Sequence, residues 1–117
     1  MKIAIIGSTA YKERMLAYKK LLESIYKDIK VSIPAFDDHP ELNELGICKY
    51  NLWKIKEADR VDIFWDCRSM GTIFDFGMAF ALGKPIKVVY LEPKTFMNVM
   101  RQYEADNSCE IELKKKV

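Results

Sequence analysis

The sequence predicts a small doubly wound α/β domain with a mainly parallel sheet, and two observations lead to that prediction. Short apolar runs rich in β-branched residues alternate along the chain with longer segments of helical periodicity. The apolar runs are also nearly continuous, which is typical of parallel strands covered by helices on both faces. In such a sheet a ligand site is expected beyond the carboxyl ends of the strands, where the strand order reverses.

The first three elements follow from the first 34 residues. Residues 3–6 form a β-branched run that Gly7 closes, which indicates a buried strand. A helix is predicted over about residues 12–27, because its apolar residues recur at helical spacing. These residues are Met15, Leu16, Leu21, Leu22 and Ile25. A short second strand at residues 31–34 ends at Pro34, which cannot continue a ladder of hydrogen bonds.

The middle of the chain repeats this alternation. After a turn-rich loop at residues 36–40, a helix is predicted over residues 41–57, with Leu45, Cys48, Leu52 and Ile55 sharing one face. A third strand is predicted at residues 61–65 and a third helix over about residues 72–82. The fourth strand is predicted at residues 86–91.

The end of the chain is less patterned. Pro93 precedes a predicted last helix, residues 94–103, whose apolar residues either offer a contact face to another subunit or pack against the same domain: Phe96, Met97, Val99, Met100 and Tyr103. Residues 110–113 are expected to form an edge strand or to fray together with the tail 110–117. No linker, repeat or low-complexity segment interrupts the chain, so residues 1–117 are interpreted as a single domain.

Composition excludes several classes of partner. The 117 residues carry a formal net charge of +2, which gives no polyelectrolyte argument for nucleic-acid binding. The lysine run 114–116 is interpreted as a solvated tail. No apolar run approaches the length that spans a membrane.

Cysteine and histidine usage argues against a metal site. The three cysteines are widely spaced and His39 is the sole histidine, so a cluster of four soft zinc ligands is not expected. The apolar run at residues 3–6 is too short for a signal peptide. These observations favour a reduced, intracellular protein, and the cytoplasm is the expected location.

The turn after the first strand is the first candidate binding segment. Gly7 and Ser8 offer backbone N–H groups and a hydroxyl at the end of a strand, which suits an anion or a sugar hydroxyl. The segment lacks the glycine spacing of a dinucleotide fingerprint and the Gly-Lys-Ser/Thr ending of a phosphate-binding loop. Ser8 can equally cap a helix. Tyr11 can stack on a base, although aromatic residues at such positions are more often core.

The second candidate segment follows the third strand. Asp66 stands at the carboxyl end of that strand, where it can bind a ligand or cap a turn. Ser69 can donate to an anion or cap the following helix, and Gly71 lets a ligand approach the backbone closely. Asp75 is expected near the first turn of that helix, either as a catalytic or sugar-binding carboxylate or as a partner of the helix dipole. Asn51, on the preceding helix, looks locally like an exposed amide.

Several of these segments together resemble the nucleoside 2-deoxyribosyltransferase family. The matching segments are Gly7-Ser8, Asn51-Leu52, Ala58-Asp59, Ser69-Met70-Gly71-Thr72 and Phe74-Asp75-Phe76-Gly77-Met78-Ala79. The resemblance covers about residues 1–92 and is specific over residues 58–85. It implies a compact Rossmann-like fold. It also implies base exchange on 2-deoxyribose, or hydrolysis of deoxynucleoside 5′-monophosphates, with neither metal nor cofactor.

The resemblance assigns the catalytic role to Asp75. In that family a glutamate within a Glu-x-Gly-x-Ala segment attacks the anomeric carbon and forms a covalent glycosyl-enzyme. Asp75 occupies the position of this glutamate and is one methylene shorter. A misplacement of about 1 Å can cost on the order of a hundredfold in rate, yet an aspartate remains chemically competent as a glycosyl nucleophile.

Two further positions depend on the same resemblance. Asn51 aligns with the family's second acidic residue, which helps to protonate the leaving base, and an amide cannot act as a general acid. Ser69 aligns with a position that is aspartate in the transferases and a phosphate-contacting serine in the monophosphate N-glycosidases. A neutral donor tolerates a phosphate dianion that a carboxylate would repel, so Ser69 favours a nucleotide as substrate.

Three readings of the sequence therefore stay open. The first is an enzyme that cleaves or exchanges the N-glycosidic bond of a nucleoside or its 5′-monophosphate. The second is a nucleotide-binding relative without turnover, which both Asp75 and Asn51 favour. The third is an α/β domain that acts through protein contacts. The family resemblance also implies a homo-oligomer whose sites borrow residues from a neighbouring subunit.

Overall fold

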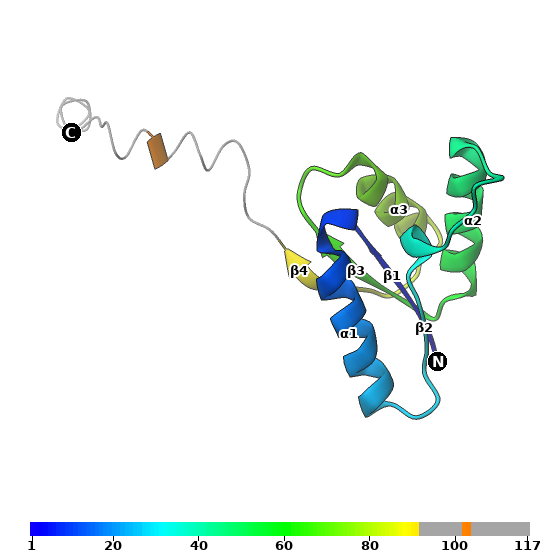
Figure 1. Cartoon of the computed structure of the whole chain (residues 1–117), viewed down its shortest axis with the longest axis vertical. Coiled ribbons are helices and arrows are strands. Elements are labelled where there is room, and N and C mark those ends of the chain that lie inside the picture. Colours follow the sequence, from blue (N-terminus) through cyan, green and yellow to red (C-terminus); the bar gives the residue numbers. More distant parts are fainter. Residues whose placement is uncertain (92–101, 104–117) are drawn as a thin grey trace.

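The computed structural model describes residues 1–91 and 102–103. In this part of the chain the strands are β1 (Lys2–Gly7), β2 (Lys30–Ser32), β3 (Arg60–Trp65) and β4 (Ile86–Leu91). They form one parallel sheet in the order β2-β1-β3-β4 (Figure 1). The chain leaves β1 toward β2 and later returns to its other side as β3, so the strand order reverses between β1 and β3. The predicted doubly wound α/β fold is confirmed.

Three helices cover the sheet: α1 (Lys12–Ile25), α2 (Glu44–Glu57) and α3 (Met70–Ala81). Figure 1 shows α1 on one face and α2 with α3 on the other. Two single turns of 3-10 helix, η1 (Thr9–Tyr11) and η2 (Pro34–Phe36), follow β1 and β2. Both turns therefore lie at the carboxyl edge of the sheet, where the site is expected.

Each face of the sheet has its own core. Ile3, Ile5 and Phe64 pack with Met15 and Leu22 of α1 on one face. On the other face the buried residues come from β1, β3, α2 and α3: Ile6, Ile55, Val61, Ile63 and Ala79. Alternate residues of β1 thus enter opposite cores, as a strand buried on both faces requires.

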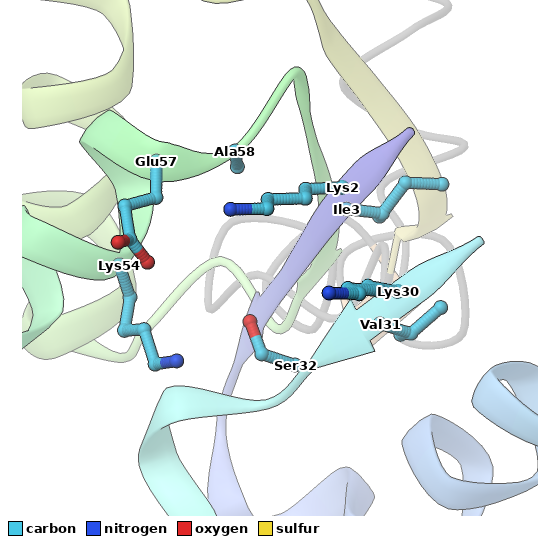
Figure 2. Close-up of a pocket in the computed structure, with 8 residues that line it drawn as sticks. All are labelled: Lys2, Ile3, Lys30, Val31, Ser32, Lys54, Glu57 and Ala58. Atoms are coloured by element: carbon cyan, nitrogen blue, oxygen red, sulfur yellow. The ribbon is translucent and has the colours of Figure 1, made fainter. Parts of the chain in front are cut away.

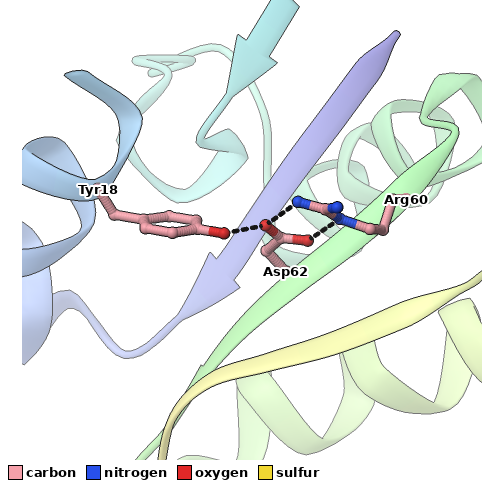
Figure 3. A network of polar contacts seen from close by, with 3 residues as sticks. All are labelled: Tyr18, Arg60 and Asp62. Carbon is pink, nitrogen blue, oxygen red and sulfur yellow. Dashed lines mark hydrogen bonds and ion pairs between the residues drawn. The ribbon is translucent and has the colours of Figure 1, made fainter. Parts of the chain in front are cut away.

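One buried polar network interrupts the apolar packing on the α1 face. The Asp62 side chain is fully buried in the sheet. Its carboxylate accepts a hydrogen bond of 2.6 Å from the Tyr18 hydroxyl and pairs with Arg60, whose Nε lies 2.6 Å from Oδ1 (Figure 3). A second Arg60 nitrogen donates to Oδ2 at 2.9 Å, so the contact is bidentate. Burial and the Asp62 carboxylate raise the pKa of Tyr18 to about 12.

The helix boundaries differ from the prediction at two starts. α2 begins at Glu44 rather than near residue 41, because the Asn43 side chain caps it by accepting from the Gly46 N–H at 2.8 Å. α3 begins at Met70 rather than near residue 72, because Ser69 caps it. Capping side chains fix a helix start more sharply than apolar periodicity does.

The predicted apolar faces are also only partly buried. Of the predicted face of α1, Met15 and Leu22 are buried whereas Leu21 and Ile25 are more than half exposed. On α2, Ile55 is buried and Leu45 is exposed. Each helix packs on the sheet through a narrow strip of side chains. Fewer residues are therefore buried than the predicted apolar face contains.

The predicted helix 94–103, its contact face and the predicted edge strand 110–113 lie outside the described residues, apart from positions 102 and 103. Within the part of the chain that the structure describes, no helix combines the length and the apolarity needed to cross a membrane.

Candidate functional site

The loop from β3 to α3 is built around Asp66 and Ser69. Asp66 Oδ1 accepts hydrogen bonds from the backbone N–H groups of Arg68 at 2.9 Å and Ser69 at 2.7 Å. Desolvation opposes the charge of this carboxylate, but the backbone hydrogen bonds outweigh it and lower the pKa of Asp66. Cys67, between them, has a φ of 62°, a left-handed conformation that is uncommon for a residue with a side chain. Asp66 therefore has the turn-capping role that was one of its two predicted readings.

Both candidate serines cap helical turns. The Ser8 hydroxyl accepts from the Ala10 N–H at 3.2 Å, and the Ser69 hydroxyl accepts from the Thr72 N–H at 3.4 Å. Each hydroxyl carries one donor hydrogen besides its accepting lone pairs. Capping therefore leaves Ser8 and Ser69 able to donate to an anion placed beside these turns.

The two candidate glycines differ in their surroundings. A Cβ on Gly7 would lie 2.8 Å from the Phe64 carbonyl oxygen and 3.1 Å from the Met15 sulfur, so close packing of β1 against β3 and α1 requires this glycine. A Cβ on Gly71 would meet nothing within 4 Å. Gly71 therefore leaves the backbone at the start of α3 open to approach, as the prediction expects of it.

Tyr11 lies on the α1 side of the sheet. Its ring packs edge-on against Tyr90, with centroids 5.1 Å apart, and it contacts the apolar core there. Asn51 and Asp75, by contrast, belong to the helices of the opposite face. The contacts of Tyr11 thus fit the core reading that was weighed against base stacking.

Asp75 lies deeper in α3 than the sequence predicts. Because Ser69 caps the helix, Asp75 falls in the second turn, and the first turn of α3 has no acidic residue. The expected stabilisation of this carboxylate by the helix N-terminus is therefore wrong, since that effect fades beyond the first turn. Burial instead raises the pKa of Asp75 to about 6. A carboxylate whose pKa is raised by burial in this way is typical of catalytic sites.

The two residues expected to be catalytic meet between α2 and α3. The side chain of Asn51 lies close enough to Asp75 to lower the pKa of that carboxyl, which partly offsets the effect of burial. The chain brings them together because α2 and α3 pack side by side on the same face of the sheet. An amide donor fixes the orientation of a carboxylate without competing for its proton.

A small cavity adjoins Asn51 on the α2 side. It has a volume of about 100 Å³ and is lined by η2, the loop after it and α2: Pro34, Ala35, Asp37, His39, Leu42, Ile47, Tyr50 and Asn51. The Tyr50 hydroxyl donates to Asp37, and the His39 ring lies 4.3 Å from the Tyr50 ring. Burial and the Asp37 carboxylate raise the pKa of Tyr50 to about 12.

Sequence reasoning missed the part that Tyr50, Asp37 and His39 play in this cavity. The sequence predicts only a turn-rich loop at residues 36–40, and His39 is singled out there only as the sole histidine. The signal available was the position of Tyr50 next to Asn51 on one helix. Its pairing with Asp37 depends on how η2 folds back over α2, which no local pattern encodes.

Nothing in the described residues forms a metal site: no group of three or more histidine, cysteine, aspartate or glutamate side chains is placed to hold an ion. Comparison of the chain with protein-family models finds no match. A search of curated proteins finds no match either. The function therefore has to be argued from the site itself.

Proposed function

We propose that this protein cleaves or exchanges the N-glycosidic bond of a (deoxy)nucleoside 5′-monophosphate or nucleoside, with Asp75 as the nucleophile. The observation that supports the proposal most is the meeting of Asn51 and Asp75 between α2 and α3, with burial raising the pKa of Asp75 to about 6. The resemblance of residues 69–79 to the nucleoside 2-deoxyribosyltransferase family assigns the same carboxylate on separate grounds.

The proposed reaction has two steps. Asp75 attacks C1′ of the sugar, a glycosyl ester forms, and the base leaves with the electrons of the C1′–N bond and takes a proton from water. Water or a second base then attacks C1′, which releases the sugar product and restores the carboxylate. Asn51 orients Asp75 and hydrogen-bonds the sugar or base, because an amide has no proton to give as a general acid.

The 5′-phosphate end is assigned to the turns at the reversal of strand order. Ser8 and Ser69 cap η1 and α3 there, and each keeps a donor hydrogen. The start of α3 is also open at Gly71. Backbone N–H groups at a helix start favour an anion, so this edge suits a phosphate better than a nucleoside hydroxyl alone.

A second candidate function is binding of the same nucleotides without turnover. The amide at position 51 favours it, because the site then lacks a proton donor for the leaving base. Loss of one such donor lowers a rate by about 10²–10⁴-fold without affecting binding in the same measure. Enzyme and binder therefore differ in turnover and share a ligand.

We also propose that the chain works as a homo-oligomer. One side of α3 exposes Met70, Ile73 and Phe74 with 83%, 48% and 54% of their surface accessible. Exposed apolar side chains in a row on one helix are typical of protein interfaces. This row begins beside the start of α3, so a neighbouring subunit placed there would border the candidate site.

The experiment that tests the activity is release of free base. Purified protein is incubated with ribo- and deoxyribonucleosides and their 5′-monophosphates, with and without a second base, and products are separated by chromatography. We expect release that is abolished in Asp75→Ala and retained in Asp38→Ala, a matched change in an exposed loop. Ligand-induced thermal stabilisation without any release would favour the binder instead. Neither release nor stabilisation would contradict both functions.

A further inference from the structure

The amino ends of the strands hold a second concave site, at the edge of the sheet opposite the candidate active site. A cavity of about 260 Å³ lies between the β1–β2 edge and the last turns of α2. Figure 2 shows its lining: Lys2, Ile3, Lys30, Val31, Ser32, Lys54, Glu57 and Ala58. β1 spans six residues, so roughly 15 Å or more separates Lys2 in this cavity from Gly7 at the carboxyl end of β1.

Lysine side chains dominate the polar lining of this cavity. Lys2 and Lys30 extend side by side from the sheet toward α2, while Lys54 and Glu57 project from α2 (Figure 2). The three ammonium groups and the single carboxylate leave a net charge of +2 around one opening. The hydroxyl of Ser32 adds a neutral donor to the lining.

The sheet itself places two of these charges in an unfavourable arrangement. Lys2 and Lys30 are direct partners across the parallel β1–β2 pair. Like charges side by side on neighbouring strands repel each other and destabilise the pairing. Glu57 supplies one negative charge, which leaves the three lysines in excess. The Lys54 ammonium lies 5.1 Å from the centroid of the Trp53 ring, which restricts its freedom at the rim.

We propose that this cavity binds a phosphate monoester dianion, independently of the candidate active site. A phosphoryl group carries about −1.5 to −2 charges near neutral pH and several strong acceptor oxygens, which matches the net charge and the donors of the lining. The volume lies just below the usual range for drug-sized ligands, so a small phosphate ester fits better than a large one. Bound there, the dianion relieves the repulsion between Lys2 and Lys30.

The test is a titration of the ¹⁵N-labelled full chain at low ionic strength, followed residue by residue in ¹H–¹⁵N spectra. The probes are inorganic phosphate and adenosine 5′-monophosphate. We expect saturable shifts at the amides of Lys2, Lys30 and Ser32. Tighter binding of the nucleotide would identify an organic ester as the ligand, and equal binding would identify free phosphate.

Substitutions distinguish binding of phosphate in this cavity from general attraction of phosphate by surface charge. The double substitution Lys30→Gln and Lys54→Gln should weaken binding at least about tenfold, whereas the double substitution Lys49→Gln and Lys56→Gln, the same charge change on α2 outside the cavity, should change it by less than about twofold. The spectra report folding of each variant directly. Equal losses in all variants, or absence of saturable shifts at the cavity, would overturn the proposal.

This experiment and the base-release assay distinguish failure of the phosphate-cavity proposal from failure of the proposed function. Shifts confined to Ser8 and to the start of α3 would support a phosphate subsite at the candidate active site. They would overturn the proposal that phosphate binds in the cavity between the β1–β2 edge and α2. Shifts at Lys30 and Ser32 without base release from any nucleotide would leave the second site standing and contradict the enzyme.

Discussion

The proposed function depends on Asp75. Its carboxyl group sits between α2 and α3, where burial raises its pKa to about 6 and the Asn51 amide partly compensates. Near neutral pH most of the group is ionised, as a nucleophile requires, although the surroundings penalise the charge. The protein thus holds this anion at a cost in stability.

That cost predicts a pH-dependent gain from neutralising the residue. Because the folded-state pKa lies above the usual value of 3.8, the wild-type protein loses stability as pH rises toward 6. Asp75→Asn should therefore raise the free energy of unfolding by about 1–2 kcal/mol at about pH 7.5, discounted for partial solvation, and by almost nothing at about pH 3.5. Urea denaturation at both pH values measures the difference.

Asp38→Asn is the matched control, because this carboxyl belongs to an exposed loop. It should change the free energy of unfolding by no more than about 0.5 kcal/mol at either pH. A destabilising effect of Asp75→Asn at neutral pH would show that the carboxylate is held by favourable contacts, and the argument from burial would then be wrong.

Substitutions of Ser69 can separate its role as a helix cap from a role in phosphate recognition. Aspartate and asparagine cap helices about as well as serine, so Ser69→Asp and Ser69→Asn should each alter stability by no more than about 0.5 kcal/mol. The added carboxylate of Ser69→Asp should repel a phosphate dianion and reduce the preference for a 5′-monophosphate over its nucleoside by at least about tenfold.

The neutral variant Ser69→Asn tests whether charge causes that effect. It should keep most of the preference, as measured by the ratio of kcat/KM values or of affinities. An unchanged preference in Ser69→Asp would place the phosphate elsewhere and leave Ser69 as a cap alone.

At the scale of elements, the network of Tyr18, Arg60 and Asp62 fastens α1 to the central strand β3. Removal of Asp62 leaves the half-buried guanidinium of Arg60 without its partner. Asp62→Ala should therefore lower the free energy of unfolding by about 3–5 kcal/mol. Tyr18→Phe removes one hydrogen bond and should cost about 1 kcal/mol. Denaturant midpoints of the two variants check both values, and similar small losses in both would mean that the ion pair contributes little.

Three glycines show how much the elements constrain single positions. At Gly7 the close approach of Phe64 and Met15 leaves no room for a Cβ, whereas at Gly71 the same atom meets open space. At the end of α3, Gly83 has a φ of 67°, and the Lys84 N–H bonds to the Ala79 carbonyl at 3.0 Å, which is a Schellman ending. One helix thus ends on a required glycine and begins beside a glycine that packing leaves free.

At the scale of the whole molecule, the sequence was sufficient to predict the succession of strands and helices along the chain and the parallel direction of the strands. Continuous apolar runs and intervening helices predict a parallel sheet with its site at the reversal of strand order, and the topology confirms the sheet. The start of α3 was missed by two residues, which moved Asp75 out of the first turn. The difference arises because the Ser69 hydroxyl caps the helix, and apolar periodicity does not indicate where such a cap stands.

The candidate site was predictable only in part. Asn51 was singled out by a family resemblance, since a helical amide alone carries no signal. Its contact with Asp75, the cavity behind it and the Tyr50–Asp37 pair all depend on how α2, α3 and η2 pack. Such packing joins residues far apart in the chain, and local periodicity does not encode it.

The most direct test of the central claim is to trap the covalent intermediate. A 2′-fluorinated deoxynucleoside 5′-monophosphate slows departure of the sugar from the enzyme, because the fluorine destabilises the positive charge at C1′ in the transition state. Mass spectrometry of the intact chain and of its peptides then locates the adduct. The account predicts a sugar-phosphate adduct on Asp75 that is absent in Asp75→Asn. An adduct on another residue, or base release without any adduct on Asp75, would contradict it.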